Sequence, residues 1–390
     1  MYSTNDYLSA IEPSITIKLN TLAKSMKAHG IDVVDLTAGE PDFPTPKEIC
    51  EAAINAINEG FTKYTAAAGI MELREKIAEK LSKENFIPVE AKNIVVTNGA
   101  KNAIFNALSA IVNPGDEVII IAPAWVSYIP QVKLLGAIPV VLCTSFENGF
   151  IPEISKLREI VNTKTKAIII NSPNNPTGAV YPKEFFKNLV ELAQEAKFYI
   201  ISDEIYEKLI YEGEHFSPAS LSMENVITVN GFSKAYSMTG WRIGYVAAND
   251  FIISNISKIQ SHTASNVNSI TQKAAVRAFD VDTNYMVEEF KKRRDFLATE
   301  LEKIGVKFLK PSGAFYFFMD FSSFLGKSSM GKKLETGFDV CEVLLKEFKL
   351  ALVPGEGFEA PGFVRLSFAA SMESLEKAIN RIKEFLESLI

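Results

Sequence analysis

The sequence predicts an α/β protein, with a large domain built on a mostly parallel sheet between two layers of helices and a smaller α+β domain. Two observations predict this class. Short apolar runs alternate with longer amphipathic runs through the middle of the chain. From residue 284 on the order changes, and a long charged helical segment precedes a new set of strands and helices. We place the large domain at residues 47–285 and form the smaller one from residues 1–46 and 286–390.

Seven segments of the large domain are expected to be strands. Residues 166–170 form a nearly continuous β-branched run, which is typical of a strand covered on both faces. The other six are residues 93–97, 117–121, 140–143, 198–202, 226–229 and 243–247. Helices are expected between them at residues 101–112, 152–161 and 182–196. The first helix is stopped by the turn residues that follow it, and the last has a proline near its first turn.

The C-terminal part has its own pattern. A long amphipathic helix is expected first, over residues 284–304. Further strands and helices follow it: strands at residues 314–319, 350–353 and 363–368, and helices at residues 338–348 and 372–390. The chain before residue 46 has no sheet pattern of its own, and we expect it to pack against this part.

The composition is that of an ordinary globular chain. Its 390 residues are 47% apolar and 23% charged, which is enough apolar surface for a substantial core. The formal net charge is −6 and no basic run occurs, so nucleic acid is not an expected partner. The longest apolar stretches are too short to cross a bilayer, so no membrane is expected either. Residues 1–13 lack the apolar core of a signal peptide, and we expect a cytoplasmic protein.

Neither the cysteines nor the histidines show a metal-binding spacing. Cys50, Cys143 and Cys341 lie far apart and form no CxxC pair, so we expect three buried free thiols rather than disulfides or a zinc cluster. The three histidines are also scattered, and no HExxH motif occurs. We therefore predict no dedicated metal site.

Two short motifs lack the context that their chemistry needs. Residues 355–360 match the spacing of a dinucleotide fingerprint, but Pro361 and Gly362 follow instead of a helix. Residues 326–328 are similar to the end of a phosphate-binding loop, but Phe321 stands where its first glycine belongs. Neither motif supports a nucleotide site.

Polar residues follow four of the predicted strands at the point where each strand ends. They are residues 98–101, 171–178, 203–206 and 230–234. Ligands of open parallel sheets bind beyond the carboxyl ends of the strands, so these groups are expected to meet at one edge. Asp203 and Lys234 come after apolar strands, which favours a site over chance.

This combination of groups suits one kind of cofactor. A lysine near a buried sheet edge is costly to keep charged, so the pKa of Lys234 should fall and its amine should form Schiff bases. Pyridoxal phosphate also needs an acid at its ring nitrogen, donors around its phosphate and a platform for its ring. Asp203 supplies the acid, and Trp125 is a candidate platform. Candidate phosphate donors are Gly99, Ala100 and Lys101, which open a helix, together with Ser233 and Arg242.

Three motifs resemble those of class I and II aminotransferases. They are residues 171–178 (NSPNNPTG), 202–206 (SDEIY) and 233–244 (SKAYSMTGWRIG). The resemblance runs almost end to end, from Pro13-Ser14 through residues 36–43 (LTAGEPDF) to residues 365–367 (RLS). The chain is most similar to the prokaryotic subgroup of aspartate aminotransferases. This implies fold type I of the pyridoxal-phosphate-dependent transferases, with a seven-stranded sheet, and a homodimer with active sites at the subunit interface.

The resemblance also implies the reaction and the roles of the cofactor-binding residues. An amino group would pass reversibly between L-aspartate and 2-oxoglutarate by a ping-pong mechanism with pyridoxal 5′-phosphate. Lys234 would bond to the cofactor and then shuttle the substrate proton, while Asp203 would keep the ring nitrogen protonated. Asn175 and Tyr206 would hydrogen-bond the ring 3′-oxygen. The phosphate would be held by Gly99, Ala100, Lys101, Ser233 and Arg242, and by Tyr64 of the neighbouring subunit.

The resemblance assigns further residues to the substrate. Arg365 would bind the α-carboxylate by a bidentate pair, and Gly39 would lie against the substrate. Trp125 and Asn175 are also expected on the substrate side. Lys101 would receive the distal carboxylate of a dicarboxylic substrate, and Thr16 would line the same pocket. Relatives that also use prephenate tend to have a basic residue where this chain has Glu12, so we expect prephenate to be a poor substrate.

Each assignment has an ordinary structural alternative. Lys234 and Lys101 could be solvated lysines, Asp203 a helix N-cap, Trp125 a core residue, Gly39 a turn glycine, and Arg365 part of a surface ion pair. Functional alternatives also remain open: an aminotransferase for prephenate, alanine or aromatic amino acids, or a carbon–sulfur β-lyase with the same cofactor. Two other classes of protein are disfavoured. A sensor module of a regulator would carry an added DNA-binding domain, and this chain has no basic helix–turn–helix extension. A nicotinamide dehydrogenase would need a dinucleotide fingerprint, which is missing.

Overall fold

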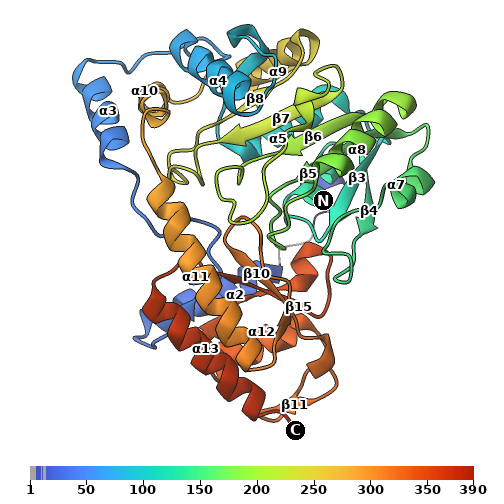
Figure 1. Cartoon of the computed structure of the whole chain (residues 1–390). Helices are drawn as coiled ribbons and strands as arrows, with labels where there is room; N and C mark the ends of the chain where they lie inside the picture. The colour runs from blue at the N-terminus through green and yellow to red at the C-terminus, as the bar shows by residue number, and fades with distance from the viewer. Residues whose placement is uncertain (1–5, 10, 12–14) are drawn as a thin grey trace, which may run out of the picture.

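The structure is a computed structural model that describes residues 6–9, 11 and 15–390. A seven-stranded sheet forms the centre of the upper part of the molecule (Figure 1). Its spatial order is β2-β8-β7-β6-β5-β3-β4. The strands are β2 (Ile94–Thr97), β3 (Glu117–Ala122), β4 (Ile138–Cys143), β5 (Thr165–Asn171), β6 (Tyr199–Asp203), β7 (Val226–Gly231) and β8 (Gly244–Ala247). β8 runs antiparallel to the other six strands, which all point the same way. The predicted α/β fold with a mostly parallel seven-stranded sheet is therefore confirmed.

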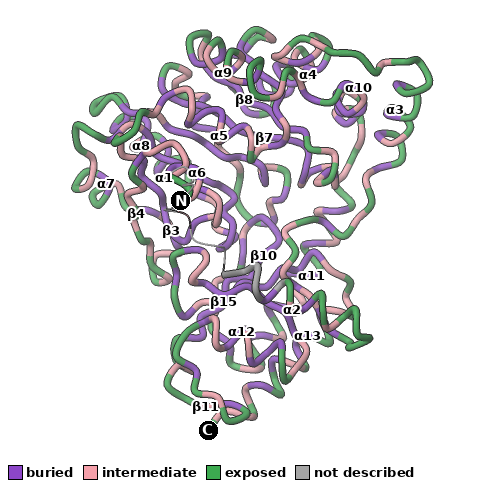
Figure 2. Tube along the Cα trace, turned by 180° about the vertical axis from the view of Figure 1, so that it is seen from behind, coloured by how far each residue is buried: buried purple, intermediate pink, exposed green. Residues whose placement is uncertain are grey.

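Helices cover both faces of this sheet because its strands are apolar on both sides. Alternate residues of β3 enter different clusters: Ile119 and Ile121 join one, and Val118 and Ile120 join the other. The first cluster includes residues of α3 (Lys47–Asn58), α4 (Met71–Glu84), α7 (Ile154–Ile160), α8 (Lys183–Ala196) and α10 (Ser269–Ala278). The second includes residues of α5 (Ala100–Ile111), α6 (Tyr128–Leu134) and α9 (Asp250–Thr263). Figure 2 shows the resulting buried interior.

A second, antiparallel sheet lies in the lower part of Figure 1. Its order is β14 (Val353–Pro354), β15 (Phe363–Ser367), β10 (Tyr316–Asp320) and β9 (Lys307–Phe308). The helices around it are α2 (Ile15–Ala28), α11 (Asn284–Lys303), α12 (Gly337–Lys346) and α13 (Met372–Glu387). The remaining elements are α1 (Asp6–Ser9) and the hairpin of β11 (Ser328–Ser329) and β12 (Lys332–Lys333). The exact domain boundaries given above stay a prediction.

Two short strands differ from the expectation. β1 (Val34–Asp35) pairs in parallel with β13 (Leu350–Ala351), although no strand was expected before residue 46. The expected strand at residues 350–353 is divided, because β13 pairs with β1 while β14 joins the lower sheet. Both features depend on partners far away in the sequence, which a local pattern does not reveal.

The cysteines also differ from the expectation. Cys341 is buried, but Cys50 is partly exposed and Cys143 is exposed. Cys143 ends β4, which is the last strand at one edge of the sheet, so one side of this strand has no neighbouring strand to cover it. The prediction of three buried thiols was therefore wrong for two of them.

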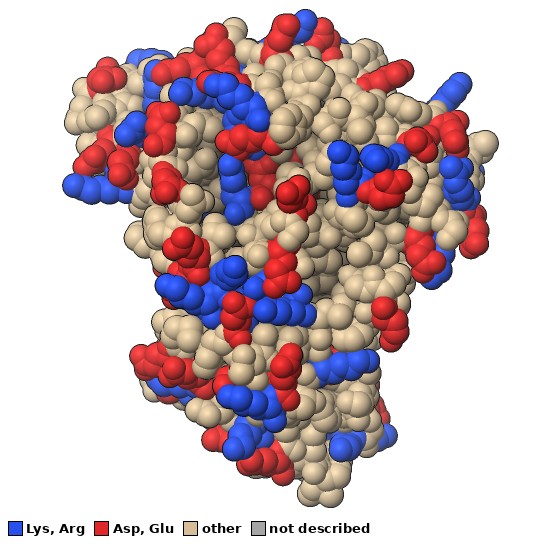
Figure 3. All heavy atoms as spheres, viewed as in Figure 1, with Lys and Arg blue, Asp and Glu red and all other residues tan. Residues whose placement is uncertain are grey.

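Two further observations concern the exterior. Within residues 6–9, 11 and 15–390, no helix has the length and apolar character that a membrane crossing requires. Figure 3 shows Lys and Arg side chains interspersed with Asp and Glu side chains over the face in view.

Candidate active site

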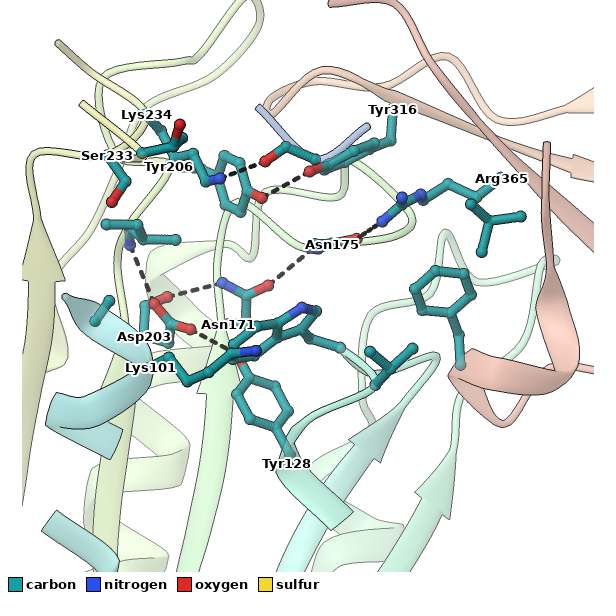
Figure 4. A pocket seen from close by; sticks show the side chains of 18 of the residues that line it. Lys101, Tyr128, Asn171, Asn175, Asp203, Tyr206, Ser233, Lys234, Tyr316 and Arg365 are labelled. Carbon is teal, nitrogen blue, oxygen red and sulfur yellow. Dashed lines mark hydrogen bonds between the residues drawn. The ribbon is translucent and has the colours of Figure 1, made fainter. Parts of the chain in front are cut away.

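A cavity of about 440 Å³ lies where the carboxyl ends of the upper strands face the lower sheet. Figure 4 shows side chains from both parts pointing into it. Most of the predicted site residues line this cavity: Gly39, Ala100, Lys101, Trp125, Asn175, Asp203, Tyr206, Ser233, Lys234, Arg242 and Arg365. The structure therefore brings together residues that are spread over most of the chain.

Of the predicted site residues whose side chains the structure describes, Gly99 and Tyr64 do not line the cavity. Gly99 lies just behind it, with a φ of +84°, and a Cβ there would stand 2.6 Å from Arg242 Nη2. Tyr64 is 89% exposed. Thr16 lies in α2, but its side chain is not among those that the structure describes. Glu12 lies outside the described residues.

Lys234 follows β7 and points into the cavity from the turn that begins after Gly231. Its amine donates a hydrogen bond to the carbonyl oxygen of Gly39, and it lies 5.9 Å from the ring centroid of Tyr206. Burial lowers the pKa of Lys234 to about 8, against the smaller opposing effect of Glu40. A substantial fraction of the amine is therefore neutral near physiological pH, unlike that of a solvated surface lysine.

Asp203 is the last residue of β6 and is only 4% exposed. The hydroxyl of Tyr128 donates to its Oδ2 at 2.7 Å, and the amide of Ile205 donates to its Oδ1 at 3.3 Å. Burial raises the pKa of Asp203 to about 6, while the bond from Tyr128 acts in the opposite direction. Asp203 precedes a turn rather than a helix, so the N-cap alternative does not describe it.

Arg365 reaches the cavity from β15 of the lower sheet and is 6% exposed. Its Nη1 donates to Asn175 Oδ1 at 3.0 Å, and its Nη2 donates to the carbonyl oxygen of Thr37 at 2.8 Å. Its Nε has no hydrogen-bond partner and no carboxylate pairs with it among the described residues. A buried guanidinium without a counter-ion is costly, so this position suits an anionic ligand rather than a surface ion pair.

Two tyrosines that sequence reasoning did not select complete the centre of the cavity. The Tyr128 hydroxyl donates a hydrogen bond to the Asp203 carboxylate. The only local sequence signal for Tyr128 is that it comes three residues after Trp125, whose ring it contacts. Tyr316 belongs to β10, and its hydroxyl lies 2.8 Å from that of Tyr206. The Arg365 guanidinium lies 4.4 Å from the Tyr316 ring centroid. Tyr316 therefore links the upper and lower halves of the site.

Gly39 approaches this pair closely. A Cβ on Gly39 would stand 3.1 Å from the Tyr316 hydroxyl. The φ angle of Gly39 is not positive. The alternative that Gly39 is a turn glycine with unusual dihedral angles is therefore wrong. The space around Gly39, rather than its backbone conformation, explains why a larger residue would not fit easily.

Cationic groups gather at the N-terminus of α5. Lys101 lies in its first turn, with Nζ 4.9 Å from the centroid of Trp125. Arg242 Nη1 donates to the carbonyl oxygen of Thr239 at 2.8 Å, and its Nη2 donates to that of Asn98 at 3.4 Å. Burial, followed by the charge of Arg242, lowers the pKa of Lys101. Two cations beside a helix N-terminus form a favourable anion site.

The cavity therefore has a cationic group at each of two ends, with a buried amine and a carboxyl between them. Arg365 marks one end, and Arg242 with the first turn of α5 marks the other. Such an arrangement can hold a doubly anionic small molecule and a carboxylate side by side, with Lys234 in reach of both. Lys101 adds a further cation on the Trp125 side.

Comparisons with known proteins agree on one family. Residues 31–382 match the model for aminotransferase class I and II. The chain is 47% identical to an aspartate aminotransferase of Thermotoga maritima, over 98% of each chain. It is 43% identical to an aspartate/prephenate aminotransferase of Thermus thermophilus, over 97% of each.

Solved structures agree with these relatives. The crystal structure of the Thermotoga maritima aspartate aminotransferase matches with a TM-score of 0.93 and 46% identity, over 99% of this chain and all of that one. An aspartate aminotransferase from Rhizobium meliloti matches with a TM-score of 0.96 and 37% identity, over the full length of both chains.

Proposed function

The chain belongs to the class I and II aminotransferase family, and we propose on this premise that it is a pyridoxal-phosphate-dependent aspartate aminotransferase. It would transfer the amino group of L-aspartate to 2-oxoglutarate, giving oxaloacetate and L-glutamate. The observation that carries the proposal is that Lys234 and Asp203 line one cavity together with Arg365, a buried guanidinium that has no carboxylate partner among the described residues. Relatives named aspartate aminotransferase support the choice of substrate.

The residues present fit pyridoxal 5′-phosphate. The absence of a side chain at Gly99 leaves room for the Arg242 guanidinium beside the first turn of α5, where the phosphate would bind. Ser233 and the amides of Ala100 and Lys101 would add donors there. Trp125 would form a platform for the ring, and Asp203 would meet its nitrogen. When bound, the cofactor supplies an electron sink that makes the substrate Cα proton acidic.

The protein's own groups would then orient the substrate and move one proton. Arg365 would fix the α-carboxylate, and Asn175 would hold the guanidinium from the other side, as its 3.0 Å hydrogen bond suggests. Asp203 would hold a proton at the ring nitrogen, and the Tyr206 hydroxyl would donate to the ring oxygen. Lys234 would take the proton from the substrate Cα, because an amine with a pKa near 8 is a suitable general base near neutral pH.

The side chain of the substrate would be read on the Lys101 side of the cavity. A second carboxylate would be attracted by this lysine, and Gly39 would leave space for the substrate itself. Thr16 is proposed as a further lining residue. A second candidate substrate is prephenate, because relatives at 43% and 46% identity carry names with both substrates. We still expect prephenate to be poor, because Glu12 would repel its second carboxylate.

We further propose a cytoplasmic homodimer. Tyr64 is 89% exposed and lines no part of its own chain's cavity, which supports a role in the phosphate site of the partner subunit. The exposed apolar residues Ile54, Ile57 and Met71 come from the same region of the chain and are consistent with an interface there.

A spectral titration of the purified holoenzyme tests the proposal. L-Aspartate and L-glutamate should convert the visible absorption band of the bound cofactor to that of its amine form, and 2-oxoglutarate should reverse the change. Conversion by alanine or aromatic amino acids alone would show that the proposed role of Lys101 is wrong. Release of pyruvate and ammonia without any oxo-acid acceptor would favour the β-lyase alternative instead.

A further inference from the structure

A buried polar cluster lies directly behind the turn that carries Asp203 and Tyr206. These two residues line the cavity, whereas Glu204 and Glu207 point away from it. The side chain of Glu204 is 1% exposed and that of Glu207 is 9% exposed. Two carboxyl groups are therefore buried on the far side of a turn whose near side forms the site.

Each carboxyl group has a well-defined set of partners. Glu204 Oε1 accepts hydrogen bonds from the hydroxyls of Ser202 at 2.9 Å and Ser217 at 2.8 Å. Its Oε2 lies 2.9 Å from His215 Nε2. Glu207 is paired with Lys80 of α4 and accepts a hydrogen bond from Asn85 at 2.8 Å. His215 Nε2 lies 3.9 Å from Glu207 Oε2, so it is close to both acids.

The charge of this cluster depends on His215. The titratable groups that face His215 or the two acids are Glu204, Glu207, Lys80, Tyr236 and Tyr245. Burial raises the pKa of both tyrosines, so they are neutral. Two carboxylates face a single lysine, and the cluster is neutral only while His215 is protonated. Burial lowers the pKa of His215, but the carboxylates of Glu204 and Glu207 together outweigh this effect and the pKa is raised.

The cluster is not arranged as a metal site. Ligand atoms of Glu204, Glu207 and His215 lie within 4.8 Å of one another. However, the ammonium of Lys80 is bound to Glu207, and serine hydroxyls occupy the other carboxylate. A divalent cation would have to displace Lys80, so an ion network describes these contacts better.

We propose that His215 is a positioning residue which, by neutralising Glu204, keeps the neighbouring carboxyl of Asp203 ionised for the ring nitrogen of the cofactor. This rests on the proposed function, since only a bound ring makes use of that carboxylate. Glu204 is the residue next to Asp203, and its charge raises the pKa of Asp203. His215 Nδ1 has no hydrogen-bond partner within the described chain, so the contacts that favour the protonated ring are those of Nε2 with the two carboxylates.

The test compares the pH dependence of cofactor affinity in a double-mutant cycle that removes the charges of His215 and Glu204. Cofactor-free protein is titrated with pyridoxal 5′-phosphate at a series of acidic to neutral pH values, and the midpoint at which affinity falls is compared between variants. His215→Gln can still donate a hydrogen bond to Glu204 but carries no charge, so its midpoint should rise by about one pH unit. Glu204→Gln should lower the midpoint, and the double variant should return it close to that of the wild type.

Opposite shifts separate this role from a purely structural one, which would weaken binding in both single variants. His262→Gln is the matched control, because His262 is exposed, and its midpoint should not move. If His215→Gln does not fold, the downward shift in Glu204→Gln carries the test. If the variants bind the cofactor and their midpoints are unchanged, the inference about His215 is wrong, while the proposed function is unaffected. Failure of the wild type to bind the cofactor at all would overturn the proposed function as well.

Discussion

Lys234 combines burial with nearby charges in a way that makes its reactivity depend on pH. Only the neutral amine can attack the aldehyde of the cofactor, and its pKa is lowered to about 8. Below that value the neutral fraction falls about tenfold for each pH unit, and above it the fraction levels off. We therefore expect the rate of cofactor uptake by the cofactor-free protein to rise with pH and to level off just above pH 8.

Stopped-flow absorbance of the visible band measures this rate. Lys234→Ala should show no such band, while Lys187→Ala, at an exposed position of α8, should behave as the wild type. A rate that still rises steeply well above pH 9 would show that Lys234 keeps the pKa of a solvated lysine.

Lys101 provides a test of substrate choice at the same scale. Its ammonium lies over Trp125, which also lines the cavity, on the side where a distal carboxylate would bind. Lys101→Gln removes the charge and keeps a hydrogen-bond donor, so the KM for L-aspartate should rise about 10- to 100-fold, the range expected for a charge-assisted hydrogen bond. Turnover of L-alanine is the internal reference and should change little. Equal losses for both amino acids would mean that Lys101 serves the cofactor instead.

Site residues that directly follow strands could be predicted from the sequence, whereas those positioned by tertiary contacts could not. Lys234 and Asp203 could be predicted because each comes directly after a short apolar run. Tyr316 could not, because it lies within an apolar strand of the C-terminal part and meets Tyr206 only in the folded chain. The buried cluster around His215 was overlooked for the same reason, since its acids and its two cations come from separate elements.

At the scale of elements, the loop between β2 and α5 is shaped by Gly99. Its φ of +84° is strained for other residues, and a Cβ would stand 2.6 Å from Arg242 Nη2. Gly99→Ala should therefore lower the free energy of unfolding by about 1–2 kcal/mol. It should also weaken cofactor binding, because Arg242 would have to move away from the helix N-terminus.

Gly115→Ala is the matched control for this variant. Its φ is +88° and the space around it is open, so it should lose similar stability without a change in cofactor affinity. Chemical denaturation and a cofactor titration distinguish the two effects. Equal cofactor affinity in both variants would show that the contact between Gly99 and Arg242 is not important for the phosphate site.

The strands of the large sheet were predictable because each is a short apolar run between polar turns, and all seven lie within a few residues of their expected positions. The β1–β13 pair was not, because β1 has no local strand pattern and the partner of the strand expected at residues 350–353 lies far away in the sequence. Helices α3, α4, α9 and α10 were not assigned from the sequence, although their apolar faces pack against the same sheet.

At the scale of the whole molecule, a mixing experiment tests whether Tyr64 completes the site of the partner subunit. Lys234→Ala and Tyr64→Ala homodimers should each lack normal sites. A hybrid dimer would have one intact site, because the Lys234→Ala chain still supplies Tyr64 to the partner's Lys234. Random mixing should therefore restore about a quarter of wild-type activity at limiting cofactor, as a symmetric dimer requires. No gain above the unmixed variants would show that Tyr64 does not act across an interface.

The pairing of β1 with β13 joins the beginning of the chain to its end, since Val34 lies opposite Leu350. On the ribosome, β1 therefore emerges long before its partner exists and stays unpaired until residues 350–351 have been made. Arg365 also comes from this late segment. The nascent chain can thus assemble the lysine-bearing sheet early, but the guanidinium proposed to hold a substrate carboxylate is absent until the segment with Arg365 has been made.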